Sequence, residues 1–142
     1  MTDELLPDPS TPFGERVARR LRDDPVVWLT TVGAGGAPRP NPVWFLWDGE
    51  TFLVYNAAHA RRLRHIVARP LVALNFDRDD AGSVIVANGL AALSPGEPPA
   101  HRAPAFMAKY GARMAMGPER WAEAFPVALR VRPMRVRGHL GG

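Results

Sequence analysis

Residues 26–56 read VVWLTTVGAGGAPRPNPVWFLWDGETFLVYN and contain three apolar segments separated by turns. Residues 26–32 and 42–48 are rich in β-branched and aromatic side chains, which favour strands. Residues 51–56 form a third such segment after the tight turn DGE. The stretch therefore predicts three consecutive strands in an antiparallel meander.

A helix is expected just before this meander. Thr11 offers a capping hydroxyl in front of a proline, and Val17 and Leu21 recur at four-residue spacing. Residues 1–10 have no such pattern and are expected to be a flexible N-terminal arm. Residues 11–142 are short enough to form one domain around a single core.

The second half of the chain predicts one more basic helix, further strands and two short helices. Residues 59–69, HARRLRHIVAR, place apolar side chains at helical spacing. Further strands are expected at residues 71–76, 83–93 and 127–138, with Gly89 as a candidate β-bulge, and two helices between residues 106 and 125.

Six antiparallel strands with one inserted helix are too few for two full packed sheets. Closure into a small barrel suits them better, because it removes exposed strand edges. The predicted fold is therefore mainly β with α (α+β), a six-stranded antiparallel barrel with peripheral helices.

Several strands are apolar on both faces. Leu29 and Trp28 are neighbours on one strand and point to opposite sides, and so must Trp44 and Trp47, which are three residues apart. One face lines the barrel, and the other has to meet a helix or a second subunit. This pattern predicts a homodimer.

Composition restricts the class of protein. There is no cysteine, which excludes disulfides and thiolate chemistry and fits a reducing compartment.

The N-terminus does not resemble a signal peptide, and no segment approaches the roughly 20 apolar residues of a membrane span, so we expect a cytoplasmic protein without membrane contact. The net charge of +4 comes almost wholly from arginine, without the clustered charge and interleaved aromatics of nucleic-acid binders, so no nucleic acid is expected. The four histidines have no metal-ligand spacing, and no metal site is predicted.

The basic helix allows two interpretations. Arg61, Arg62 and Arg64 stand near its N-terminus, where positive side chains oppose the helix dipole. They form either a solvated helix face or, together with the free backbone N–H groups of the first turn, an anion site. The residues alone leave both interpretations open.

Four phrases in this order resemble a known family. They are PRPNPVWFLWDGETFLVY, ARRLRHIVARPLVAL, FMAKYGARMAMGPERW and RVRPMRVRGH, and they extend from about Pro25 to His139. The chain is similar to the split-barrel flavin and deazaflavin proteins of the pyridoxamine-phosphate-oxidase-like superfamily, and most similar to their actinobacterial branch, which uses the deazaflavin coenzyme F420. In that register Arg62 takes the place of a lysine, Arg64 matches a second basic residue, and His65 stands where asparagine is common.

The resemblance implies a homodimer of split β-barrels whose two cofactor sites are built from both subunits. It implies that the planar ring of the cofactor lies against Asn41, Pro42, Val43 and Trp44, and that the phosphate lies near Asn56, Ala57, Arg61, Arg62, Arg64 and His65. Lys109 and Tyr110 would close a substrate pocket, with Tyr110 as a candidate proton donor.

The implied activity is that of an oxidoreductase. Reduced F420 would transfer a hydride to an electron-poor double bond of a small planar organic substrate. Two alternatives share the barrel: an FMN-binding oxidase or reductase, and a non-catalytic protein that binds a cofactor or haem. The arginine excess near the site favours F420, because F420 carries an acidic tail as well as a phosphate.

Overall fold

One antiparallel sheet organises the molecule. The structure, a computed structural model, describes residues 6–80 and 82–140. Within these residues seven strands form a sheet in the order β2-β1-β5-β6-β7-β4-β3. The strands are β1 (Val27–Val32), β2 (Pro38–Val43), β3 (Leu46–Trp47), β4 (Phe52–Asn56), β5 (Leu71–Asn75), β6 (Val84–Leu93) and β7 (Val127–His139). The helices of the described residues are α1 (Pro12–Asp23), α2 (Arg61–Ala68), α3 (Pro104–Tyr110) and α4 (Pro118–Ala124), with short 3₁₀-helices at Ala100–Arg102 and Gly111–Arg113.

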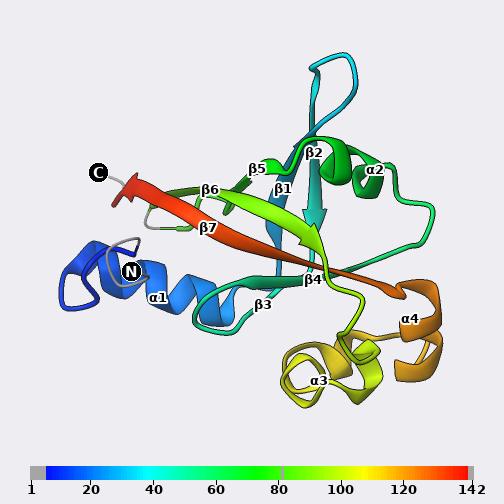
Figure 1. Ribbon diagram of the computed structural model, residues 1–142. Helices are drawn as coiled ribbons and strands as arrows, with labels where there is room; N and C mark the ends of the chain where they lie inside the picture. Colours follow the sequence, from blue (N-terminus) through cyan, green and yellow to red (C-terminus); the bar gives the residue numbers. More distant parts are fainter. Residues whose placement is uncertain (1–5, 81, 141–142) are drawn as a thin grey trace.

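The sheet curls into an open barrel (Figure 1). Because helices accompany this antiparallel sheet, the fold is mixed α+β. Its two edge strands, β2 and β3, are consecutive in the chain and are joined only by Trp44 and Phe45. The predicted number of six strands is wrong, because residues 42–48 form the end of β2 and the separate strand β3. The strand breaks at Phe45, whose backbone N–H donates to the Tyr110 hydroxyl and whose backbone oxygen accepts from the Lys109 Nζ, in place of bonds to a neighbouring strand.

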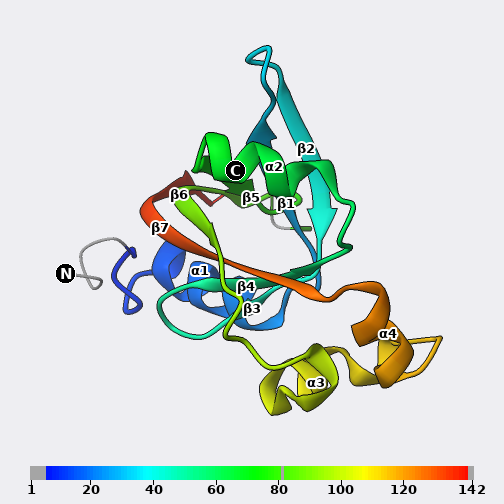
Figure 2. The ribbon, with the colours of Figure 1, turned by 45° about the vertical axis from the view of Figure 1, so that its right-hand side comes forward.

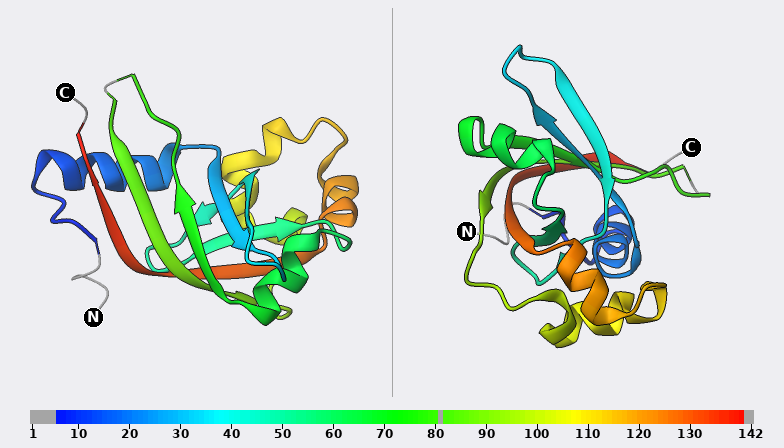
Figure 3. Two further views of the ribbon diagram at one scale, coloured as in Figure 1. Left: turned by 90° about the horizontal axis from the view of Figure 1, so that it is seen from above. Right: turned by 90° about the vertical axis from the view of Figure 1, so that its right-hand side faces the viewer.

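Helix α1 packs into the concave side of the curled sheet (Figure 3). Its start is as predicted, since the Thr11 side chain accepts a hydrogen bond from the backbone of Gly14 at 3.0 Å. Val17 and Leu21 are buried in the main core with residues from the inner face of the strands. Residues 1–5 of the predicted arm lie outside the described residues, whereas Leu6 packs against this core.

Helices α3 and α4 form a separate lobe against β4 and β7 (Figure 2). Strand β4 is therefore buried on both faces: Val54 faces the barrel core, and Tyr55 faces the lobe. The two tryptophans also separate, with Trp44 packed against the lobe and Trp47 against the main core. The prediction that a two-faced strand meets a helix is confirmed for β4.

The predicted bulge in β6 is confirmed. The pairing of β6 with β7 shifts register between Asn88 and Gly89. A Cβ atom at Gly89 would lie 2.7 Å from the backbone oxygen of Arg132, so only glycine fits this close approach. No helix in the part of the chain that the structure describes is long and apolar enough to cross a membrane.

Candidate functional site

Two cavities meet at a single arginine. The first, called the basic cavity, has a volume of about 440 Å³ and is lined by Thr31, Arg39, Asn41, His59, Ala60, Arg61, Arg62 and His65. The second, called the aromatic cavity, has a volume of about 220 Å³ and is lined by Pro42, Val43, Trp44, Tyr55, Arg62, Trp121 and Phe125. Arg62 lines both.

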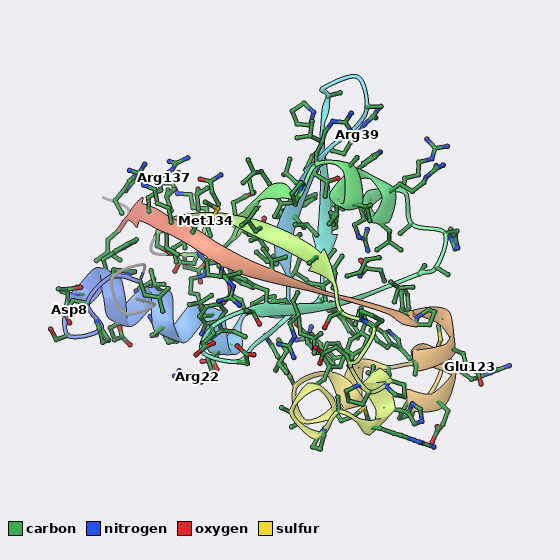
Figure 4. All side chains as sticks on the ribbon, viewed as in Figure 1. Asp8, Arg22, Arg39, Glu123, Met134 and Arg137 are labelled. Atoms are coloured by element: carbon green, nitrogen blue, oxygen red, sulfur yellow. The ribbon has the colours of Figure 1, made fainter. Side chains whose placement is uncertain are left out.

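The basic cavity lies between the β1–β2 hairpin and the start of α2. Arg39 and Asn41 are two residues apart on β2 and therefore point to the same face, beside Thr31, the cross-strand partner of Arg39. Figure 4 shows Arg39 on this hairpin, above α2. From the helix side, the His65 Nδ1 lies 3.4 Å from the Thr31 hydroxyl.

Among residues 6–80 and 82–140, no carboxylate lines the basic cavity, and the first turn of α2 has none either. The N-cap residue of α2 is Ala60, whose side chain cannot accept a hydrogen bond from the first turn, and this turn contains no acidic residue. The backbone N–H of Leu63 donates to the backbone oxygen of Ala60 at 3.2 Å, whereas the N–H groups of Arg61 and Arg62 and the positive end of the helix dipole remain available to an anion. The donor set of arginines, histidines and backbone N–H groups fits a phosphate or carboxylate.

Asn56 holds Arg62 in place. The Arg62 Nε donates a hydrogen bond of 2.7 Å to the Asn56 side-chain oxygen. The Asn56 side-chain nitrogen in turn donates to the backbone oxygens of Val54, at 3.0 Å, and Val127, at 2.9 Å. Burial lowers the pKa of Arg62 below its ordinary value, but the ordinary value of arginine is so high that the guanidinium stays charged.

Beside the aromatic cavity, the ring of Trp44, the residue directly after β2, stacks on rings of the α3–α4 lobe. The Trp44 ring lies parallel to the Tyr110 ring at 4.5 Å and to the Trp121 ring at 5.3 Å, measured between ring centroids. Phe125 packs on Trp121 at 4.5 Å. Flat apolar walls of this kind accommodate a planar group.

The structure brings most of the predicted cofactor residues to these two cavities. Asn41, Arg61, Arg62 and His65 line the basic cavity, and Pro42, Val43, Trp44 and Arg62 line the aromatic cavity. Three others do not line either cavity: Arg64 is exposed on α2, Ala57 precedes the helix, and Asn56 lies fully buried behind Arg62.

Several lining residues were not predicted. Arg39 and His59 add positive or polar groups to the basic cavity, and Trp121 and Phe125 add rings to the aromatic cavity. The sequence held a signal for Arg39, which shares a strand face with Asn41. Trp121 lies on α4 and Phe125 directly follows its last residue, so a four-residue spacing of two aromatic residues was the signal for this pair.

The prediction that Tyr110 lines a substrate pocket and donates a proton is not supported by its surroundings. Tyr110 is fully buried, and its hydroxyl is bonded to the backbone of Phe45 and lies 2.7 Å from the backbone oxygen of Pro25. Burial raises its pKa to about 12. The hydroxyl is therefore enclosed by the backbone of its own chain and anchors α3 to the corner between β2 and β3.

Lys109 lies at the same corner rather than at either cavity. Its Nζ donates a hydrogen bond of 3.0 Å to the backbone oxygen of Phe45 and lies 3.8 Å from the centroid of the Phe45 ring. Burial lowers the pKa of Lys109 to about 8, and the carboxylates of Asp24 and Asp23 offset part of this effect.

Among the described residues there is no group of three or more histidine, aspartate or glutamate side chains placed to hold a metal ion. The chemical character of the two cavities is thus that of an anion site beside an aromatic slot.

The family model of pyridoxamine 5'-phosphate oxidase matches residues 13–140, nearly the whole chain. The chain belongs to this family. No curated protein matches the sequence significantly.

Solved structures with the same fold differ in what their names say they bind. An F420 reductase is 26% identical, covers 84% of this chain and 94% of its own, and superposes with a TM-score of 0.69. HutZ, a haem storage protein from Vibrio cholerae, is 18% identical with coverages of 92% and 98% and a TM-score of 0.69. A FAD-binding protein from Mesorhizobium loti is 14% identical with coverages of 87% and 90% and a TM-score of 0.65.

Proposed function

We propose that this member of the pyridoxamine 5'-phosphate oxidase family binds coenzyme F420 and, with its reduced form, reduces an electron-poor double bond of a small planar organic substrate. The observation that carries the proposal is the pair of cavities that share Arg62: a basic cavity free of carboxylates beside a slot of stacked aromatic rings. The likeness to an F420 reductase supports the choice of cofactor.

The residues of the basic cavity fit the anionic part of this cofactor. The guanidinium of Arg62 and the first turn of α2 suit a phosphate, because arginine can donate two parallel hydrogen bonds to phosphate oxygens. Arg39, Arg61 and His59 line the rest of the cavity and suit the acidic tail that F420 carries beyond its phosphate. FMN has no such tail and would leave these side chains without a partner.

The chain's own contribution to the reaction is binding and orientation. When bound, the reduced deazaflavin supplies the hydride, so that no side-chain nucleophile is needed. Pro42, Val43 and Trp44 hold a planar ring against the end of β2, and the rings of Trp121 and Phe125 exclude water from it. Because Tyr110 is enclosed in the core, we expect the proton that completes the reduction to come from solvent.

We also propose that the protein is a homodimer. Val67, Leu71 and Leu90 expose 69%, 60% and 41% of their surface, and Leu71 and Leu90 are cross-strand partners on β5 and β6. Large apolar side chains in adjacent positions on a sheet are a feature of surfaces that a partner covers. A second copy of the chain is the partner that we propose for this face.

Fluorescence titration with F420 and with FMN tests the choice of cofactor. We expect F420 to bind at least tenfold more tightly than FMN. Tighter binding of FMN would replace the proposal with a flavin oxidase or reductase, and binding of haem alone would replace it with a haem carrier. Turnover of reduced F420 with a panel of enones and quinones then distinguishes a reductase from a protein that only binds the cofactor.

A further inference from the structure

Asn56 is fully buried, and its side chain already has three hydrogen-bond partners within the protein. Its nitrogen donates to the backbone oxygens of Val54 and Val127, and its oxygen accepts from the Nε of Arg62. No part of the Asn56 side chain reaches either cavity. Its contact with the site therefore runs through Arg62.

The bond to Asn56 uses one particular edge of the guanidinium. The group is planar, and its Nε–H is committed to the Asn56 oxygen at 2.7 Å. The two terminal nitrogens make no hydrogen bond to any of the residues that the structure describes, and Arg62 lines both cavities. The end-on pair of donors, which binds phosphate bidentately, is thus left free.

The amide is itself fixed by the sheet. One donated bond links the end of β4 to Val127, the first residue of β7, shortly after Trp121 and Phe125, and the other stays within β4, at Val54. An arginine side chain has several rotatable bonds, and ordering it only when a ligand arrives would cost conformational entropy. A partner that orders the side chain before binding removes part of that cost.

We infer that Asn56 is a positioning residue, which orients the guanidinium of Arg62 so that its two terminal nitrogens receive the phosphate of the cofactor. The inference rests on the proposed function, and it assigns to Asn56 a role through Arg62 in place of direct contact with the cofactor. The phosphate-free deazaflavin chromophore of F420 distinguishes a role through Arg62 from direct contact with the ring, because the chromophore has the ring and lacks the phosphate.

The experiment compares F420 with this chromophore by fluorescence titration in four proteins: wild type, Asn56→Ala, Arg62→Lys and the double variant. We expect Asn56→Ala to weaken F420 binding by about five- to tenfold, the fold-change worth one hydrogen bond, and to leave chromophore binding within twofold. Lysine has no Nε–H to position. In the Arg62→Lys background, Asn56→Ala should therefore change F420 binding by less than about twofold.

Two further variants distinguish a loss of F420 affinity from a general loss of protein stability. Asn56→Ser keeps a donor for one backbone oxygen but is too short to hold Arg62, so it should repeat the loss of F420 affinity in a more stable protein. Val54→Ala removes a fully buried side chain from the same strand, two residues before Asn56, without touching Arg62. It should lower the melting temperature and leave F420 affinity within about twofold.

Three results would overturn the inference, and they are distinguishable from failure of the proposed function. Equal weakening of F420 and chromophore binding, a full loss in the Arg62→Lys background, or no loss in Asn56→Ser would each show that Asn56 does not act through Arg62. In all three cases wild type still binds F420. If wild type binds neither F420 nor its chromophore, the proposed function fails as well.

Discussion

The hydroxyl of Tyr110 accepts a hydrogen bond of 2.9 Å from the backbone nitrogen of Phe45 and lies 2.8 Å from the backbone oxygen of the same residue. The hydroxyl thus satisfies the backbone N–H of a residue at which the strand is interrupted, and the Lys109 Nζ donates a hydrogen bond of 3.0 Å to the backbone oxygen of the same residue. Tyr110 and Phe45 are 65 positions apart in the sequence, so the contact also attaches α3 to the barrel.

Removal of this hydroxyl should cost stability. We expect Tyr110→Phe to lower the free energy of unfolding by about 1 to 3 kcal/mol, because the buried N–H of Phe45 loses its partner. Tyr55→Phe is the matched control, since the Tyr55 hydroxyl donates to only one backbone oxygen, that of Pro98, and should cost less. Urea denaturation measures both. A loss of turnover in Tyr110→Phe with unchanged stability would instead restore Tyr110 as the proton donor.

Lys109 should make stability depend on pH in the alkaline range. Its pKa is about 8 in the folded protein and about 10.5 in the unfolded chain, so the unfolded chain binds more protons between these values. The cost of burying the charge is fully present below pH 8 and disappears as pH rises toward 10.5. Relative to Lys109→Met, wild type should therefore gain about 1 to 3 kcal/mol between pH 7 and 10.5. A constant difference across this range in urea denaturation would contradict the expected shift.

Arg62 should contribute most of the affinity for the cofactor phosphate. We expect Arg62→Ala to weaken F420 binding by about 1.5 to 3 kcal/mol, or roughly 10- to 150-fold, with a smaller effect at high salt. It should also lower stability by about 1 kcal/mol, because the Asn56 oxygen loses its donor.

Arg69 at the far end of α2 lines neither cavity and supplies the control for Arg62. Arg69→Ala should leave F420 affinity within about twofold, as measured by fluorescence titration. Equal losses in the two variants would indicate diffuse electrostatic attraction without a specific contact.

The proposed dimer should depend on the exposed leucines of β5 and β6. Sedimentation equilibrium of the wild type should give a dimer at micromolar concentration. Leu90→Glu should shift it to monomer, because a charge replaces an apolar side chain that a partner would bury. Met116→Glu changes a side chain of similar exposure that lies after the second 3₁₀-helix, away from β5 and β6, and should leave the dimer intact. A monomeric wild type would contradict the homodimer and the two-subunit site.

The sequence by itself determined what depends on neighbours along the chain. Thr11 indicated where α1 begins, because capping involves residues within one turn. The alternating and helical patterns located the strands and α2, and Gly89 indicated a bulge whose partner strand needs close approach. The conflict of the arginines at the start of α2 with the helix dipole is also local, and it left two interpretations, an anion site and a solvated helix face.

Only the tertiary structure decided which distant side chains meet. Residues 42–48 read as one strand, and they divide at Phe45, whose backbone groups bond the side chains of Tyr110 and Lys109 from α3. Tyr110 resembled a pocket residue until packing of the lobe enclosed it. Asn56 resembled a cofactor contact, and the pairing of β4 with β7 buries its amide behind Arg62. The physical reason is the same in each case: hydrogen bonds and burial between segments far apart in sequence depend on how the sheet curls, and no local pattern records that.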